Sequence, residues 1–173
     1  MLEFQGKGVI VTGGTSGIGL AAARAFARQG AAVVISGRGV ERGREAAAHE
    51  ASPGARISFV PADIRDEQQV ARLLTQAEQI LGRFDIVVNS AGVINRIPLT
   101  ELAQPDWDDV LDTNLRGVYL VCKHVLPPMM AQGWGAIVNV ASYLGTYGSR
   151  ESTPAYNASK AGVVALTHSL ALQ

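Results

Sequence analysis

The chain has 173 residues, 47% of them hydrophobic and 17% charged, and its 15 basic and 15 acidic side chains leave no net charge. This length suits one domain with its own core, so we expect residues 1–173 to form a single domain. The balanced charge argues against an electrostatic nucleic-acid binder and against a disordered chain. The one cysteine, Cys122, excludes a disulfide framework and a cysteine-based zinc cluster.

No apolar run reaches the length that spans a membrane, and residues 1–7 lack the apolar core of a signal peptide. We therefore expect a soluble, cytoplasmic protein with neither a membrane nor a nucleic-acid partner. The three histidines, His49, His124 and His168, do not have the spacing of metal ligands, so no metal site is predicted.

Short β-branched runs alternate with longer segments of helical period along the chain. Five runs are continuously apolar, which is typical of strands covered on both faces. They comprise residues 8–12, 32–36, 57–60, 86–90 and 136–140. This alternation predicts an α/β fold, a doubly wound parallel sheet of the Rossmann type with helices on both faces.

The clearest helix is predicted over residues 66–81. Its apolar side chains recur at helical spacing and form one stripe, made of Val70, Leu73, Leu74, Ala77, Ile80 and Leu81. Asp66 and Gln69 have the spacing of a capping box at its start. Gly82 follows its last residue and is typical of a helix stop.

Two further helices are predicted in the second half of the chain. One runs from about residue 105 towards residue 130, where Pro127 and Pro128 are expected to bend or end it. The other starts near residues 153–156 and is still running at residue 173.

A glycine-rich turn follows the first predicted strand and opens the first helix. A tight turn needs a positive φ, and a backbone that approaches a pyrophosphate cannot carry a Cβ at the contact. The N-terminus of the helix offers N–H groups to the phosphates. The turn therefore predicts a dinucleotide-binding site rather than plain packing. Its candidate binding residues are Gly13, Thr15, Ser16, Gly17, Ile18 and Gly19.

The residue after the second strand bears on the choice of cofactor. No acidic residue occurs between positions 20 and 40, where an acid that binds the ribose of NAD is expected. Arg38 stands after the strand instead, and an arginine attracts a 2′-phosphate that an acid would repel. The sequence therefore favours NADP(H), with NAD(H) as the alternative cofactor and a solvated surface arginine as the alternative role of Arg38.

Further motifs follow in order along the chain. They are Asp63-Ile64 after the third strand, Asn89-Ser90-Ala91-Gly92 after the fourth, Asn114 in the long helix, Ser142 after the fifth strand and Tyr156-Asn-Ala-Ser-Lys160. Together with the glycine-rich turn, this set resembles the short-chain dehydrogenase/reductase family over essentially the whole chain. The chain departs from the family at Ser90, where a second asparagine is usual.

The resemblance implies roles for several of these residues. Asp63 and Ile64 are expected to contact the adenine. The further cofactor contacts that it implies are Asn89, Ala91, Gly92, Tyr156 and Lys160, the last through the nicotinamide ribose. Asn114 is expected to hold a water molecule that relays the proton.

The chemistry of the last motif can be derived from the residues themselves. Tyr156 and Lys160 are four positions apart and therefore share one face of a helix. A nearby ammonium lowers the pKa of a phenol from its usual value near 10, which makes Tyr156 a general acid and base. Ser142 is placed to donate to the same substrate oxygen. We predict an oxidoreductase that interconverts a small-molecule ketone and a secondary alcohol by hydride transfer.

The substrate itself stays open. Residues 89–99 and 106–110 resemble both 3-oxoacyl-carrier-protein reductases and gluconate-type sugar dehydrogenases. By resemblance, the protein is expected to be a homodimer or homotetramer packed through the helices that carry Asn114 and Lys160.

Family members continue beyond the final helix with a sixth strand, a substrate-binding segment and a seventh strand. The resemblance therefore implies a sheet that lacks the last strands usual for the family. Three alternatives are open: a piece of a longer enzyme, a sheet edge covered by a partner chain, or a non-catalytic fold that acts through its exposed strand or helix surfaces.

Overall fold

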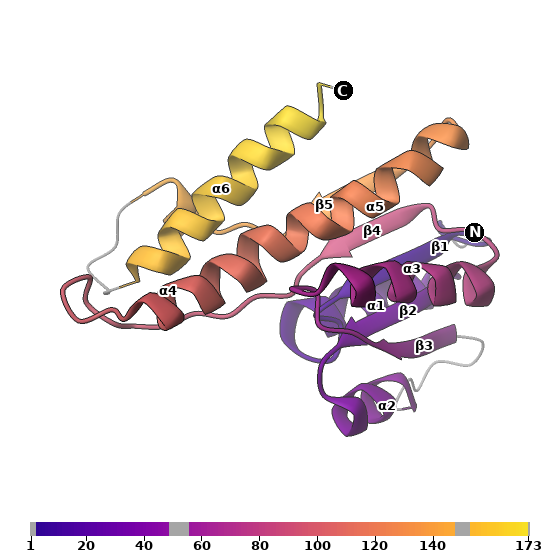
Figure 1. Ribbon diagram of the computed structural model, residues 1–173. Coiled ribbons are helices and arrows are strands. Elements are labelled where there is room, and N and C mark those ends of the chain that lie inside the picture. The colour runs from indigo at the N-terminus through magenta and orange to yellow at the C-terminus, as the bar shows by residue number, and fades with distance from the viewer. Residues whose placement is uncertain (1–2, 49–55, 148–152, 173) are drawn as a thin grey trace.

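The computed structural model describes residues 3–48, 56–147 and 153–172 (Figure 1). Its strands are all parallel and form one sheet in the order β3-β2-β1-β4-β5. Their bounds are β1 Gly8–Thr12, β2 Ala32–Gly37, β3 Arg56–Pro61, β4 Ile86–Asn89 and β5 Ala136–Asn139. Each predicted strand is confirmed to within one residue at either end, and so is the doubly wound α/β fold.

Six α-helices lie among the described residues. They are α1 Gly17–Arg28, α2 Val40–Ala48, α3 Glu67–Leu81, α4 Gln104–Leu111, α5 Gly117–Ala131 and α6 Pro154–Leu170. Helices α1 and α2 pack on one face of the sheet, whereas α3 and α5 pack on the other, and α6 packs beside α5 and β5 (Figure 1). None of these helices is both long and apolar enough to cross a membrane.

Strand β1 illustrates why continuous apolar runs form the centre of this sheet. Successive side chains of a strand point to opposite faces. Val9 and Val11 therefore pack in the cluster under α1, whereas Ile10 packs in the opposite cluster under α3 and α5. Because both faces are covered, every residue of β1 is buried.

Helix α3 begins at a capping residue, as predicted. The Oδ1 atom of Asp66 accepts the backbone N–H groups of Gln68 at 2.8 Å and Gln69 at 3.1 Å. The capping box itself differs from the prediction, because the Gln69 side chain donates to Oδ2 of Asp66 rather than accepting its N–H. Gly82 ends the helix with a φ of +77° and a ψ of −40°, a positive φ that favours glycine.

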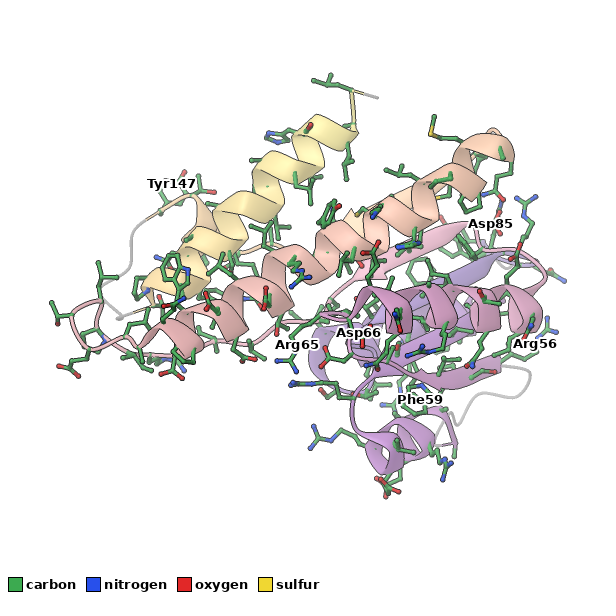
Figure 2. All side chains as sticks on the ribbon, in the orientation of Figure 1. Arg56, Phe59, Arg65, Asp66, Asp85 and Tyr147 are labelled. Carbon is green, nitrogen blue, oxygen red and sulfur yellow. The ribbon has the colours of Figure 1, made fainter. Side chains whose placement is uncertain are left out.

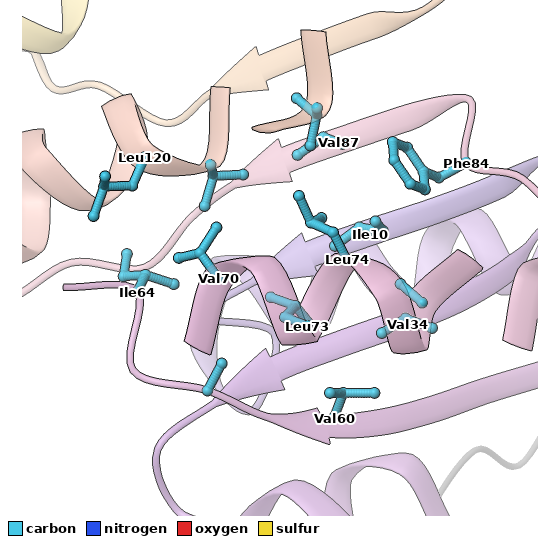
Figure 3. Close-up of a cluster of buried hydrophobic side chains, with 14 of the residues drawn as sticks. Ile10, Val34, Val60, Ile64, Val70, Leu73, Leu74, Phe84, Val87 and Leu120 are labelled. Atoms are coloured by element: carbon cyan, nitrogen blue, oxygen red, sulfur yellow. The ribbon is translucent and has the colours of Figure 1, made fainter. Parts of the chain in front are cut away.

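The predicted apolar stripe of α3 is confirmed except at Ile80. Val70, Leu73, Leu74 and Ala77 are buried against the sheet and α5 (Figure 3). Ile80 is 48% exposed. It lies at the border of the stripe, whereas Leu81, the next residue, is partly buried against the same core cluster.

The long helix differs from the prediction in two ways. It is interrupted by a π-helical turn, Asp112–Arg116, which joins α4 to α5. In addition, Pro127 and Pro128 do not end it, because α5 continues past both to Ala131. Val125 and Met129 flank the two prolines and are buried in the core, so packing holds this last turn although two backbone N–H donors are missing.

Helix α6 starts at Pro154 and ends at Leu170, earlier than predicted. Gln173 and His49 lie outside the described residues.

Cys122 is 1% exposed, and burial raises the pKa of its thiol to about 11. It is therefore an unreactive core residue.

Candidate functional site

A cavity of about 820 Å³ lies outside the carboxyl ends of the strands. The chain reaches it directly after each of the five strands, so residues far apart in sequence share one wall. The first lining residues after β1 to β5 include Gly13, Arg38, Ala62, Ser90 and Val140. In open parallel sheets, this edge is where ligands bind.

The glycine-rich turn forms the part of the wall next to α1. Gly13 has a φ of +66°, and a Cβ on it would lie 2.6 Å from the backbone of Ala91. Gly17 has a φ of +53°, but a Cβ there would meet nothing within 4 Å. Because Gly13 has no side chain, two loops can pack together there. Because Gly17 has none, the start of α1 stays open towards the cavity.

The start of α1 is suited to an anion. Ser16 is its N-cap residue, but the Ser16 side chain makes no capping hydrogen bond. The first backbone N–H groups of a helix have no partner within the helix, and the helix dipole places partial positive charge there. Thr15, Ser16, Gly17 and Ile18 line the cavity at this point, as predicted for phosphate-binding residues.

A charged group of residues lines the cavity beside the glycine-rich turn, where a Cβ on Gly37 would lie 3.0 Å from the Thr15 side chain. Arg38, Glu41 and Arg42 come from the turn after β2 and the start of α2, and Asp63 and Ile64 follow β3. The site residues predicted for the ribose phosphate and the adenine therefore line the same cavity.

Tyr156 and Lys160 line the cavity from the first turns of α6. The Nζ atom of Lys160 lies 5.8 Å from the centroid of the Tyr156 ring. It donates a hydrogen bond of 2.7 Å to the carbonyl of Val140, directly after β5. The lysine is 5% exposed, and this burial lowers the pKa of its ammonium.

Asn114 lies at the centre of the π-helical turn and is fully buried. Its side-chain oxygen accepts the N–H of Val93 at 2.8 Å, and its amide donates to the Val93 carbonyl at 2.8 Å. The same amide donates to Oγ of Ser159 at 3.0 Å, and Ser159 donates to the carbonyl of Tyr156 at 2.7 Å. A chain of hydrogen bonds thus joins the cavity wall at Val93 to the backbone of Tyr156.

Ser142 stands at the start of a single 3-10 turn, Tyr143–Gly145, after β5. Its Oγ accepts the N–H of Leu144 at 3.2 Å, which leaves the hydroxyl hydrogen to donate elsewhere. Ser142 adjoins Ala141, which lines the cavity, but does not line the cavity itself.

Two predicted cofactor contacts, Gly19 and Asn89, lie behind the wall rather than in it. A Cβ on Gly19 would lie 2.4 Å from the carbonyl oxygen of Gly13, so this glycine allows the turn to pack on α1. The Asn89 amide is 2% exposed and donates to Asn139 of the neighbouring strand at 2.9 Å. Both residues support the wall from inside the fold.

Several residues of the site have no signal in the sequence. Val93, Ile94 and Thr113 line the cavity, and Ser159 links Asn114 to Tyr156. They reach the site through contacts between distant elements. These positions follow no recurring spacing and hold no special residue type, so a sequence pattern does not identify them.

The cavity therefore combines a helix start suited to an anion with a tyrosine–lysine pair, both at the edge of the sheet where ligands bind in open parallel sheets. A family model described as short chain dehydrogenase matches residues 7–173. The chain belongs to the short-chain dehydrogenase family. This confirms the resemblance, and members of this family bind the nucleotide cofactors NAD(P).

Individual relatives of the short-chain dehydrogenase family cover nearly all of this chain. A cis-4-hydroxycyclohexanecarboxylate dehydrogenase of Sinomonas cyclohexanicum is 43% identical over 170 residues, which are 98% of this chain and 68% of that enzyme. A 3-oxoacyl-acyl-carrier-protein reductase of Thermotoga maritima is 38% identical over 168 residues, which are 96% of this chain and 67% of that enzyme. The crystal structure of levodione reductase superimposes with a TM-score of 0.94 at 35% identity. The match covers 98% of this chain and 67% of levodione reductase.

The chain thus spans about two thirds of the length of the relatives that it matches. The matched portion contains the five strands and the cavity described above.

Proposed function

We propose that this chain is an oxidoreductase that binds a nicotinamide dinucleotide in the cavity and interconverts a ketone and a secondary alcohol. The observation that carries this proposal is the placement of Tyr156 and Lys160 in the same cavity as the opening of α1. The start of α1 has the chemistry of a pyrophosphate site, and Tyr156 and Lys160 have that of an acid–base pair.

The residues present fit a dinucleotide. The cradle at Gly17 has room that a Cβ would fill, and the N–H groups at the start of α1 suit a pyrophosphate. Asp63 and Ile64 would hold the adenine, and Lys160 the nicotinamide ribose. The bound nicotinamide supplies the hydride donor or acceptor.

Tyr156 would move the proton that accompanies the hydride. Its hydroxyl donates to the substrate oxygen when a ketone is reduced and accepts the proton when an alcohol is oxidised. The Lys160 ammonium, 5.8 Å from the ring centroid, stabilises the phenolate that forms. No carboxylate of a described residue pairs with Lys160, so its positive charge acts on Tyr156 without compensation.

Ser142 and Asn114 would complete the acid–base machinery. The Ser142 hydroxyl has its hydrogen available, so it can donate to the substrate oxygen beside Tyr156. Asn114 retains one acceptor position on its side-chain oxygen, which suits the water molecule implied by the resemblance.

We propose NADP(H) as the preferred cofactor because Arg38 and Arg42 line the cavity after β2. Arginine binds phosphate with two parallel hydrogen bonds and keeps its charge at any physiological pH. NAD(H) is the alternative cofactor.

The names of the relatives support a small-molecule carbonyl or alcohol substrate. Cis-4-hydroxycyclohexanecarboxylate is a secondary alcohol, and a 3-oxoacyl group carries a ketone.

We also propose that copies of the protein associate through α5 and α6 into a dimer or tetramer. Tyr119 of α5 is 45% exposed and is an apolar candidate for such a contact.

The first test is a fluorescence titration of the 173-residue chain with NADPH and then with NADH. We expect saturable binding of both, tighter for NADPH. Equal affinity would contradict the cofactor preference. Failure to bind either nucleotide would contradict the proposed function of this chain.

A further inference from the structure

Asp63 is a carboxylate in the wall of the cavity at the end that we assign to the ribose and the adenine. Both of its oxygens are held by Arg65. Nε of Arg65 lies 3.0 Å from Oδ1 and Nη2 lies 2.6 Å from Oδ2, and the Arg65 backbone N–H also donates to Oδ1 at 3.0 Å. This is a two-pronged ion pair between residues two positions apart.

Arg65 holds this carboxylate from outside the cavity. It does not line the cavity, and its other nitrogen, Nη1, lies 2.5 Å from Oδ1 of Asp109 on α4. The guanidinium is thus fixed between β3 and α4 by two carboxylates. Asp63 is 22% exposed on the cavity side, whereas Asp109 is 48% exposed on the outer surface.

Arg38 lies near enough to Asp63 for their charges to interact. The hydrogen bonds from Arg65 are the main reason why the pKa of Asp63 is lower than usual, and the charge of Arg38 adds to this effect. Asp63 is therefore ionised at neutral pH. No carboxylate of a described residue lies within ion-pair distance of Arg38, so Arg65 and not Arg38 is the partner of Asp63.

The proposed cofactor makes this choice of partner important. A 2′-phosphate next to Arg38 carries negative charge and would be repelled by a nearby uncompensated carboxylate. A carboxylate without Arg65 would also attract Arg38 away from the phosphate. An ion pair with Arg65 removes both effects.

We propose that Arg65 determines the cofactor preference indirectly, by neutralising Asp63 so that Arg38 stays available for the 2′-phosphate of NADP(H). Arg65 is a positioning residue, since it acts through Asp63 and does not touch the cavity. The inference rests on the proposed function, in particular on the binding of NADP(H) at Arg38.

The test is the ratio of the dissociation constants for NADH and NADPH, measured by fluorescence titration of the 173-residue chain. In Arg65→Gln, we expect NADPH to bind about three- to tenfold more weakly and NADH to bind almost as in the wild type. The difference should shrink at high salt, because it is electrostatic. Loss of affinity for both nucleotides to the same extent would indicate a structural role and contradict the inference.

Two further variants separate charge compensation from a direct contact between Arg65 and the phosphate. Asp109→Asn removes the outer partner of Arg65 and leaves the pair with Asp63, so the ratio should not change. Adding Asp63→Asn to Arg65→Gln removes the uncompensated charge and should restore the NADPH preference. If the double variant stays as poor as Arg65→Gln, Arg65 contacts the phosphate directly and the inference is wrong.

The remaining outcomes distinguish this inference from the proposed function. A wild-type chain that does not prefer NADPH contradicts the cofactor assignment and the inference together. A wild-type preference that Arg65→Gln retains contradicts the inference alone. Should Arg65→Gln not fold, the comparison of Asp63→Asn with the double variant replaces it. The two NADH/NADPH ratios should be equal, because Arg65 acts only through Asp63, and a weaker NADPH preference in the double variant would contradict the inference.

Discussion

At the scale of single residues, Gly13 and Gly17 both have a positive φ in the turn before α1, yet their surroundings differ. We expect Gly17→Ala to cost only about 1–2 kcal/mol of stability, because left-handed strain is its main penalty. Its methyl group would occupy the start of α1 and lower nucleotide affinity at least about tenfold, since one lost phosphate contact of about 1.4 kcal/mol suffices for that. Denaturant unfolding and nucleotide titration measure the two effects.

Gly13→Ala is the matched comparison. Its Cβ would lie 2.6 Å from the backbone of Ala91, so strain and overpacking add. We expect a loss of about 3 kcal/mol or more in the free energy of unfolding. If Gly17→Ala proved as destabilising as Gly13→Ala, the open space assigned to Gly17 would be wrong.

Tyr156 permits a test of the acid–base role. We expect Tyr156→Phe to lower kcat by about two to four orders of magnitude, the usual contribution of a general acid or base. The Kd of NADPH should stay close to that of the wild type, because the variant lacks only the hydroxyl group. Tyr147→Phe is the control, since Tyr147 is 70% exposed and does not line the cavity. Loss of cofactor binding in Tyr156→Phe would refute the assigned role.

At the scale of elements, α3 shows how far a hydrophobic stripe determines packing. Leu73 is 1% exposed in the core beneath α3 (Figure 3), whereas Ile80 on the same stripe is 48% exposed. We expect Leu73→Ala to lower the free energy of unfolding by about 2–5 kcal/mol, and Ile80→Ala by at most about 1 kcal/mol. Urea denaturation of both variants checks this, and similar losses would mean that Ile80 is covered in solution.

The elements around the site also differ in what their sequences reveal. The capped start of α3 is visible at Asp66, because capping uses neighbours in the chain. The π-helical turn around Asn114 has no such signal. It depends on hydrogen bonds to residues 21 and 45 positions away, Val93 and Ser159. Such turns are frequent at functional sites, and here the turn places the buried Asn114 amide behind Val93, which lines the cavity.

At the scale of the whole molecule, Asp85 links two strands at the amino ends of the sheet (Figure 2), whereas the cavity lies at the carboxyl ends. It is fully buried and accepts the N–H of Gly8 on the neighbouring strand at 2.9 Å. Arg83 pairs with it, and Lys7 lies 3.5 Å away. Burial alone would raise the pKa of Asp85, but the hydrogen bonds from Arg83 and Gly8 and the two positive charges lower it below the usual range.

This lowered pKa predicts a dependence of stability on pH. The ionised Asp85 stabilises the fold at pH values above its unfolded pKa, near about 3.9, and this contribution is lost as the pH falls through the folded-state pKa. We expect Asp85→Asn to be about 1–3 kcal/mol less stable at pH 7 and to lose less stability on acidification. Thermal unfolding between neutral and acid pH tests this, with the exposed Asp108→Asn as control. Parallel pH profiles for Asp85→Asn and the wild type would contradict it.

The sequence by itself determined the strands, the glycine-rich turn, the capped start of α3 and the tyrosine–lysine pair. Each of these depends on residue type and spacing within a few positions, so the pattern carries the information. The parallel order of the sheet followed from the alternation of strands and helices, which permits few other arrangements.

Only the tertiary structure decided which of the predicted residues share the cavity. It directed the Asn89 amide to Asn139, placed Asn114 against Val93, buried Lys160 under the carbonyl of Val140 and brought Arg65 to Asp109 on α4. The direction of a side chain and its choice among several partners depend on the packing of elements that are distant in the chain. Residue spacing contains no information about that packing, because the same short pattern is compatible with many surroundings.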